Sequence, residues 1–216
     1  MKKTLLKIAI AGTGIILLVP SAFAAKEKPA ETNQSPEQVE ANYAKAIESR
    51  TADILQALAL NDTNQAARVH DIIIAQYRAL RAWHDDNDAK LKAARADTNA
   101  AAQIKISLKK LHDTFLARLA EHLTPEQVDK VKDKMTYGKV QFTFAGYVAQ
   151  YPALSDANKE KILELLKQAR EEAMDGGSAE EKTAIFQRYK GKINNYLSKQ
   201  GIHPAKEKPG AKSPAN

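Results

Sequence analysis

The chain of 216 residues contains no cysteine. Without a thiol it can form no disulfide, use no cysteine nucleophile and carry no lipid on a cysteine. We therefore expect its stability to come from a hydrophobic core alone, and we expect no metal site built from thiolates.

Long apolar runs are scarce as well. The run from Ile8 to Val19 has 12 residues, whereas a helix that spans a bilayer needs about 20. It follows three lysines and precedes Ala22-Phe23-Ala24, a pattern typical of a secretory signal peptide. We expect cleavage after Ala24 and export to the periplasm or the medium. The mature chain is then neither a lipoprotein nor a membrane-spanning protein.

No charge of one sign dominates. Lys and Arg number 33 against 26 Asp and Glu, a net charge of +7 that falls to +4 when the three lysines of the signal peptide are removed. The basic residues are spread along every segment, whereas a nucleic-acid-binding protein concentrates them on one face. We predict no nucleic-acid partner.

Sequence signatures of common catalytic sites are missing. The chain has neither G-x-S-x-G nor a glycine-rich phosphate loop. Its histidines and carboxylates do not show the close spacing of zinc ligands. We predict no metal and no cofactor, and we favour a binding role over catalysis.

Two polar ends flank the central part of the chain. Residues 25–37 and 201–216 contain few apolar side chains and several prolines, too little apolar surface to offset the entropy of ordering. We expect a signal peptide at 1–24, a disordered linker at 25–37, one helical domain at 38–200 and a disordered tail at 201–216.

Apolar side chains of the central part recur at helical spacing, and no segment alternates as a strand would. Thr124-Pro125-Glu126-Gln127 predicts a helix start with a capping box and proline at the first position. Ser155 and Ser178 are expected to cap the last two helices. The prediction is an all-α fold: a single antiparallel helical bundle of about six helices with a long central hairpin. The expected helices lie near 43–60, 64–94, 98–122, 125–150, 156–175 and 179–200.

The stretch "KDKMTYGKVQFTF" places a glycine among aromatic and β-branched residues. Gly138 falls on an apolar line with steps of three and four residues: Val128, Val131, Met135, Gly138, Phe142, Ala145 and Ala149. We favour a glycine on a buried seam that lets a neighbouring helix approach closely. A kink or break at Tyr137-Gly138 and a direct ligand contact are the alternatives.

The segments "WHDDND" and "LHDTF" carry the candidate polar site. His84 and Asp88 are one helical turn apart, and the expected hairpin brings His112 towards them. Lys132, Asp133 and Tyr137 could close the same site from a third helix. The alternative is that each histidine is a hydrogen-bonded packing residue.

The last helix contains two adjacent asparagines, which compete for backbone hydrogen bonds and form helices poorly. They could bond to a neighbouring helix end, or read the hydroxyls and carboxylate of an acidic sugar with help from a nearby cation. The complete set of candidate binding residues is His84, Asp85, Asp88, His112, Asp113, Lys132, Asp133, Tyr137, Arg170, Lys190, Asn194 and Asn195.

The segments "LTPEQVDKVKDKMTYG", "KQAREEAMDGGSAEEK" and "RYKGKINNYLSKQG" resemble an uncharacterised family of secreted bacterial helical proteins, a domain of unknown function. The resemblance covers roughly Tyr43 to Gly201. It implies a helical fold, export and a loose association with bacteria that degrade plant polysaccharides, but no established activity. The chain departs from the family pattern at Thr183 and Gln187.

The tetrapeptide after Leu123 is also similar to the LTxxQ motif of periplasmic chaperones of the Spy and CpxP kind. Three hypotheses follow. The chain is an exported binding or accessory protein with a carbohydrate or protein partner, a Spy-like chaperone or envelope-stress protein, or a carbohydrate-active enzyme of unknown mechanism. The ligand and the oligomeric state are left open.

Overall fold

The computed structural model of the chain describes residues 35–205. The expected signal peptide and most of the two expected polar ends lie outside these residues. Within them the chain forms α-helices and one short 3₁₀ helix, with no strand. The helices are α1 (Pro36–Leu58), α2 (Thr63–Ala93), η1 (Ala94–Ala96), α3 (Thr98–Ala120), α4 (Pro125–Met135), α5 (Lys139–Gln150), α6 (Asp156–Met174) and α7 (Ala179–Lys199). The all-α class is confirmed.

Short polar side chains start most of these helices. Thr124 accepts a hydrogen bond from the backbone N–H of Gln127 while the Gln127 side chain accepts one from the N–H of Thr124, the expected capping box. Ser155 and Ser178 cap α6 and α7 as expected. The start of each of these helices is therefore a local property of the sequence.

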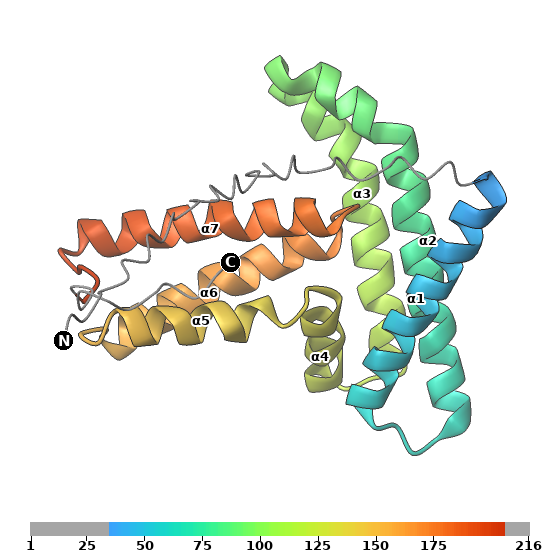
Figure 1. The fold of residues 1–216 in the computed structure, drawn as a ribbon, viewed down its shortest axis with the longest axis horizontal. Helices are drawn as coiled ribbons and strands as arrows, with labels where there is room; N and C mark the ends of the chain where they lie inside the picture. Colours follow the sequence, from blue (N-terminus) through green and yellow to red (C-terminus); the bar gives the residue numbers. More distant parts are fainter. Residues whose placement is uncertain (1–34, 206–216) are drawn as a thin grey trace, which may run out of the picture.

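The helices form two groups that lie crosswise in Figure 1. The first group contains α1, α2, α3 and α4 around one hydrophobic cluster, and the second contains α5, α6 and α7 around another. In the first group α2 and α3 form the expected long hairpin, where Trp83 Nε1 donates to Ser107 Oγ at 2.8 Å. The groups meet where α4 packs on both α1 and α6, and Met174 at the end of α6 joins the first cluster.

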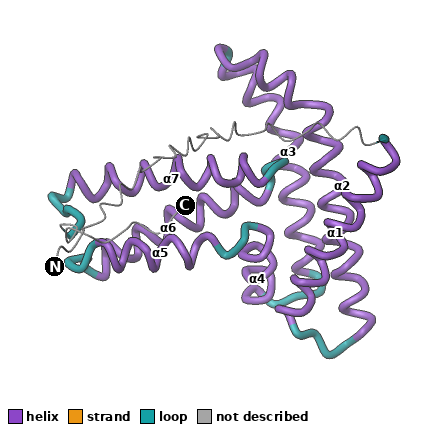
Figure 2. The backbone as a smooth tube through the Cα atoms, in the orientation of Figure 1, coloured by secondary structure: helices purple, strands orange, loops and turns teal. Residues whose placement is uncertain are grey.

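The expected helix from Pro125 to about Gln150 is broken in two. Figure 2 shows a turn between α4 and α5, and both Tyr137 and Gly138 have positive φ, 60° and 63°. A β-carbon added to Gly138 would meet no atom within 4 Å. The buried-seam interpretation of Gly138 is therefore wrong. The glycine is needed for its left-handed backbone, and the break raises the number of α-helices from about six to seven.

The break also changes which side chains of α5 are buried. The apolar side chains that were expected to face inward are buried in α4, as Val131 and Met135 show. Beyond the turn this no longer applies, because Phe142 is 82% exposed. The neighbouring line of Val140, Tyr147 and Tyr151 is buried instead and packs on α6 and α7. A left-handed turn rotates the following helix about its axis, so helical spacing read across the turn no longer marks one face.

Neither end of the described part is isolated. Ser35 caps α1 through a capping box with Gln38, and the backbone N–H of Ala205 donates to the carbonyl oxygen of Gln150 at 2.9 Å.

Among residues 35–205, no helix has the length and apolar character needed to cross a membrane.

Candidate functional site

The turn between α4 and α5 holds a tyrosine in a conformation that side chains rarely adopt. Thr136 ends α4 and donates its hydroxyl to the carbonyl oxygen of Lys132 at 2.9 Å. The N–H of Gly138 returns to the carbonyl oxygen of Asp133 at 2.8 Å. The left-handed conformation of Tyr137 costs about 1–2 kcal/mol, and such strain gathers at functional sites. The residue is 49% exposed.

A hollow of about 650 Å³ opens beside Tyr137, between α1, α2, α4, α5 and α7. A smaller hollow of about 360 Å³ adjoins it. Four side chains line both hollows, so they lie where the two meet: Arg50, Tyr77, Tyr137 and Lys182. We call the two hollows together the Tyr137 pocket. Its size lies in the range of small-molecule sites, about 300–1,000 Å³.

Lys182 is the most buried cation of the Tyr137 pocket, with 6% of the residue exposed. Its Nζ donates to the carbonyl oxygens of Met135 at 3.3 Å and Met174 at 3.2 Å. No carboxylate in residues 35–205 forms an ion pair with Lys182, although the charges of Asp175 and Glu181 favour its protonated form. Burial lowers the pKa of Lys182 to about 8, so the amine is poised between its charged and neutral forms.

Arg50 is the second unpaired cation at the junction. Its guanidinium carbon lies 6.0 Å from the centre of the Tyr77 ring, and it forms no ion pair or hydrogen bond with the rest of the described chain. Burial raises the pKa of Tyr77 to about 12, so its hydroxyl stays protonated and can donate. Two cations and two tyrosines from α1, α2, α7 and the α4–α5 turn thus converge, an arrangement suited to an anion that also carries hydroxyl groups.

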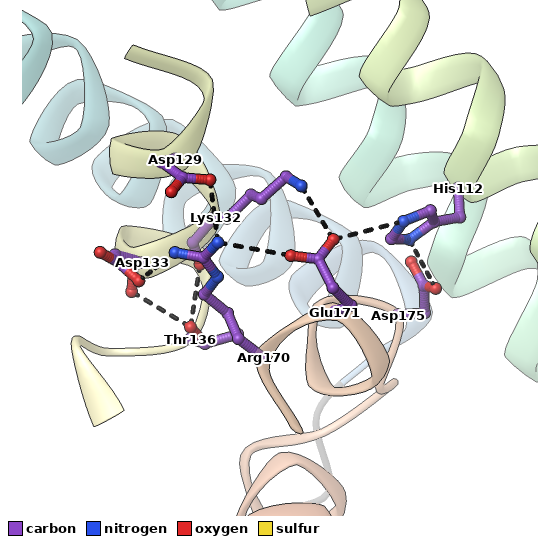
Figure 3. Close-up of polar contacts among 8 residues, drawn as sticks. All are labelled: His112, Asp129, Lys132, Asp133, Thr136, Arg170, Glu171 and Asp175. Carbon is purple, nitrogen blue, oxygen red and sulfur yellow. Dashed lines mark hydrogen bonds and ion pairs between the residues drawn. The ribbon is translucent and has the colours of Figure 1, made fainter. Parts of the chain in front are cut away.

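A second set of polar side chains joins α3, α4 and α6 (Figure 3), and we call it the Arg170 network. Arg170 is buried and donates to Asp133 Oδ1 at 2.7 Å and Asp129 Oδ1 at 2.9 Å. Beside it Glu171 accepts from Lys132 Nζ at 2.9 Å. Because each charge is met by an opposite one, the network supports the wall behind the Tyr137 pocket rather than offering a free group to a ligand.

Asp175 links the two histidines of the hairpin. Its carboxylate Oδ2 lies 2.9 Å from His112 Nδ1, and its backbone carbonyl oxygen lies 2.7 Å from His84 Nε2. The other ring nitrogen of His84 lies 2.8 Å from Asp88 Oδ1. Burial lowers the pKa of His84, but these two hydrogen bonds together with the negative charges of Glu181 and Asp88 raise it above its usual value. Both ring nitrogens thus face acceptor atoms, and the contact with the Asp175 backbone ties His84 to the end of α6.

The structure brings several of the predicted site residues together. His84 and His112 both contact Asp175, and Asp88 contacts His84. The Arg170 network includes His112, Lys132, Asp133 and Arg170. Four helices build this polar region, one more than expected, because α6 arrives between the hairpin and α4. Tyr137 points elsewhere and lines the Tyr137 pocket, where Asp133 contributes to the wall.

Other predicted residues lie apart from both sets. Asp85 pairs with Arg81, and Asp113 pairs with Lys109 on the exposed side of α3. In α7, Asn194 and the backbone of Lys190 accept from the hydroxyl of Tyr147, the packing role considered for this helix. Asn195 is exposed.

Four important residues were absent from the predicted set: Arg50, Tyr77, Asp175 and Lys182. The burial of Lys182 could have been predicted from helical spacing. It lies three and four residues before the buried Ile185 and Phe186, so it falls on the apolar stripe of α7. Tyr77 similarly follows Ile73 by one turn. Arg50 and Asp175 carried no such signal, since their partners lie on other helices.

The stability of the protein is expected to depend on pH through His112. The hydrogen bond to Asp175 raises the pKa of His112 although burial lowers it, and the nearby Glu171 adds to the rise while Lys132 opposes it. A folded-state pKa above the unfolded value of about 6.5 adds stability that is complete below that value. This stability is lost as the pH rises through the folded value.

We therefore expect His112→Asn to lower the free energy of unfolding by about 1–2 kcal/mol in mildly acidic buffer. The loss should shrink as the pH is raised above neutrality. Urea unfolding of both proteins across this range measures it. Asp175→Asn is the control, since the pH dependence of the loss should weaken when the carboxylate is removed and only Glu171 still favours the protonated ring. A loss that stays constant with pH would show that the proton on His112 contributes nothing.

Among residues 35–205, no group of three or more histidine, aspartate or glutamate side chains is placed to hold a metal ion.

Comparison with known proteins places the chain in a family. Residues 44–210 match the family described as protein of unknown function (DUF3826), from within α1 through α7. No curated protein compared with the chain matches it, and the similarity to LTxxQ chaperones stays a hypothesis. Since the match covers most of the chain and supports the expected uncharacterised family, the protein belongs to the DUF3826 family.

Proposed function

We propose that the protein is an exported binding protein that holds an acidic sugar in the Tyr137 pocket, as an accessory to the use of polysaccharides. The observation that carries this proposal is the meeting of two cations without carboxylate partners, Arg50 and Lys182, at the junction of the two hollows. Export is inferred from the sequence pattern of residues 1–24.

The charge of the larger hollow favours an anion. Lys130 and Lys134 line it in addition to the two junction cations, and neither forms an ion pair with another described residue. The carboxylates in its wall are Asp53 and Asp133, and Asp133 is already held by Arg170. Cations therefore remain in excess, and an Arg–carboxylate contact inside a pocket is a strong charge-assisted hydrogen bond.

The remaining groups of the larger hollow suit hydroxyls and a ring. Asp53 can accept hydrogen bonds from hydroxyl groups, and the amide of Gln141 can both accept and donate. The rings of Tyr77 and Tyr137 offer an apolar face beside a polar edge. A ligand with one carboxylate, several hydroxyls and a partly apolar ring, such as a uronate, matches this combination.

The chaperone hypothesis fits the described surface less well. Large apolar side chains that are exposed lie on α1, α3, the α4–α5 turn and α5: Val39, Ile106, Tyr137, Phe142 and Val148. A surface that holds unfolded chains would need such side chains gathered on one helix face. Here they are spread over several elements. The side chains of Thr124 and Gln127 are occupied in capping α4, so their spacing has a local structural reason.

Calorimetric titration of the purified exported protein tests the proposal. Galacturonate, glucuronate and their oligomers are compared with the corresponding neutral sugars, and intact mass shows whether residues 1–24 have been removed. Acidic sugars should bind and neutral ones should bind much more weakly. Arg50→Met should weaken binding about tenfold or more, since a hydrogen bond to a charged group is lost.

Arg68→Met is the matched control, because Arg68 is an exposed arginine of α2 that does not line the pocket. It should bind as the unmodified protein does. Equal binding of acidic and neutral sugars, or no effect of Arg50→Met, would contradict the proposal. Suppression of aggregation by the protein and by Arg50→Met alike, without sugar binding, would favour the chaperone.

A further inference from the structure

The amine of Lys182 is arranged as a base would be. A neutral amine has two N–H donors and one lone pair, and two backbone carbonyl oxygens, those of Met135 and Met174, accept from Nζ. With both hydrogens occupied, the lone pair is left free, and Lys182 lines both hollows. The same carbonyl oxygens would stabilise the ammonium after it had gained a proton.

Tyr137 offers a hydroxyl at the same junction. Its side chain is half exposed, and its hydroxyl forms no hydrogen bond with any residue in the 35–205 part of the chain. The ring is held there by a backbone conformation that costs free energy, with φ of 60°. Arg50, also at the junction, is the cation free to hold a carboxylate.

We propose that the Tyr137 pocket cleaves a uronate-containing chain by β-elimination. The uronate occupies one hollow and the sugar attached to its O4 occupies the other, so that the bond to be broken lies at the junction. The reaction presupposes that the pocket binds an acidic sugar, as proposed above.

The step balances without a co-reactant. Lys182 Nζ takes the proton from C5 of the uronate, and the electron pair of that C–H bond forms the C4=C5 double bond. The C4–O4 bond breaks, and the hydroxyl of Tyr137 gives its proton to the departing O4. Arg50 stabilises the charge that grows on the carboxylate when C5 loses its proton. Proton transfer from Lys182 through solvent then restores the tyrosine hydroxyl.

Hydrolysis suits this pocket less well. Most glycoside hydrolases use two carboxyl groups that flank the bond. Of the two aspartates in the wall, Asp133 is paired with Arg170 at 2.7 Å, which leaves Asp53 alone. Elimination needs a base, an acid and a cation for the carboxylate, and the junction supplies all three.

The test incubates the full exported protein with polymers of galacturonate or glucuronate linked through O4, and with a neutral polymer as the blank. Elimination should produce the ultraviolet absorbance of a C4=C5 bond conjugated to the carboxylate. Mass spectrometry should find fragments whose masses add up to that of the substrate, whereas hydrolysis adds one water for each bond cleaved. The rate should rise with pH as Lys182 loses its proton, and the midpoint of this rise should lie near the pKa of about 8.

Tyr137→Phe keeps the ring and should lower the rate about a hundredfold or more, while binding of the uronate oligomer is kept. Lys182→Met should lower the rate to a residual level that no longer rises with pH, and circular dichroism shows whether the variant folds. Arg68→Met should leave the rate unchanged. Binding without any unsaturated product, or products that have gained water, would overturn the elimination while leaving the binding function intact. Failure of the unmodified protein to bind uronates at all would instead refute the proposed function.

Discussion

Replacing Arg170 with methionine is expected to lower the free energy of unfolding by about 3 kcal/mol. Arg170 is buried with 4% exposed and donates to Asp129 and Asp133. Removing one partner of a buried ion pair leaves the other charges uncompensated, which typically costs about 3–5 kcal/mol. We expect the lower end of this range, because the two aspartates retain contact with water. Urea unfolding followed by circular dichroism measures the loss.

Two further variants separate the burial of Arg170 from its charge. Arg170→Lys keeps the charge but not the planar fork that serves two carboxylates, so an intermediate loss is expected. Arg188→Met breaks the exposed pair of Arg188 with Glu172 and should cost less than about 1 kcal/mol. Equal losses from Arg170→Met and Arg188→Met would show that the Arg170 network stabilises no more than a surface pair does.

Gly177→Ala is expected to lower the free energy of unfolding by about 1–3 kcal/mol through overpacking. The added β-carbon would lie 2.7 Å from Cγ of His84, closer than two such atoms can approach. The ring cannot move away easily, because both of its nitrogens are hydrogen-bonded, to Asp88 and to the backbone of Asp175. Urea unfolding again measures the change.

The control for Gly177 is another glycine with the opposite expectation. A β-carbon at Gly191, inside α7, would meet no atom within 4 Å, so Gly191→Ala should raise stability by up to about 1 kcal/mol. In a His84→Ala background the cost of Gly177→Ala should largely disappear, since the clashing ring is gone. A cost that is the same in both backgrounds would place the strain somewhere other than at His84.

Helix starts could be predicted because their causes are local. Thr124, Ser155 and Ser178 each bond to a backbone N–H three residues later, within one turn of the chain. The break at Tyr137-Gly138 was one of the alternatives for Gly138, but the sequence could not select it over the buried seam in the same way. Apolar spacing continues unchanged across the turn, and spacing carries no information about the sign of φ.

In the candidate site, too, only contacts between residues close in sequence could be predicted. His84 and Asp88 lie on one face of α2, as their spacing of one turn predicts, and they contact each other. The link from His84 to His112 depends on Asp175, which reaches the hairpin because the end of α6 packs against it. Asn194 has the packing role that was one of two alternatives for it, and the sequence could not separate them because Tyr147 lies on another helix.

The sequence by itself determined the all-α class, the ends of most helices and the buried stripes of α6 and α7, because capping and helical periodicity act within one or two turns. Only the tertiary structure decided the Tyr137 pocket. Arg50, Tyr77, Tyr137 and Lys182 come from four separate segments, and they meet because the two groups of helices cross at the α4–α5 turn. The direction in which the chain leaves a left-handed turn, and the packing of one helix group on another, depend on contacts between residues far apart in sequence.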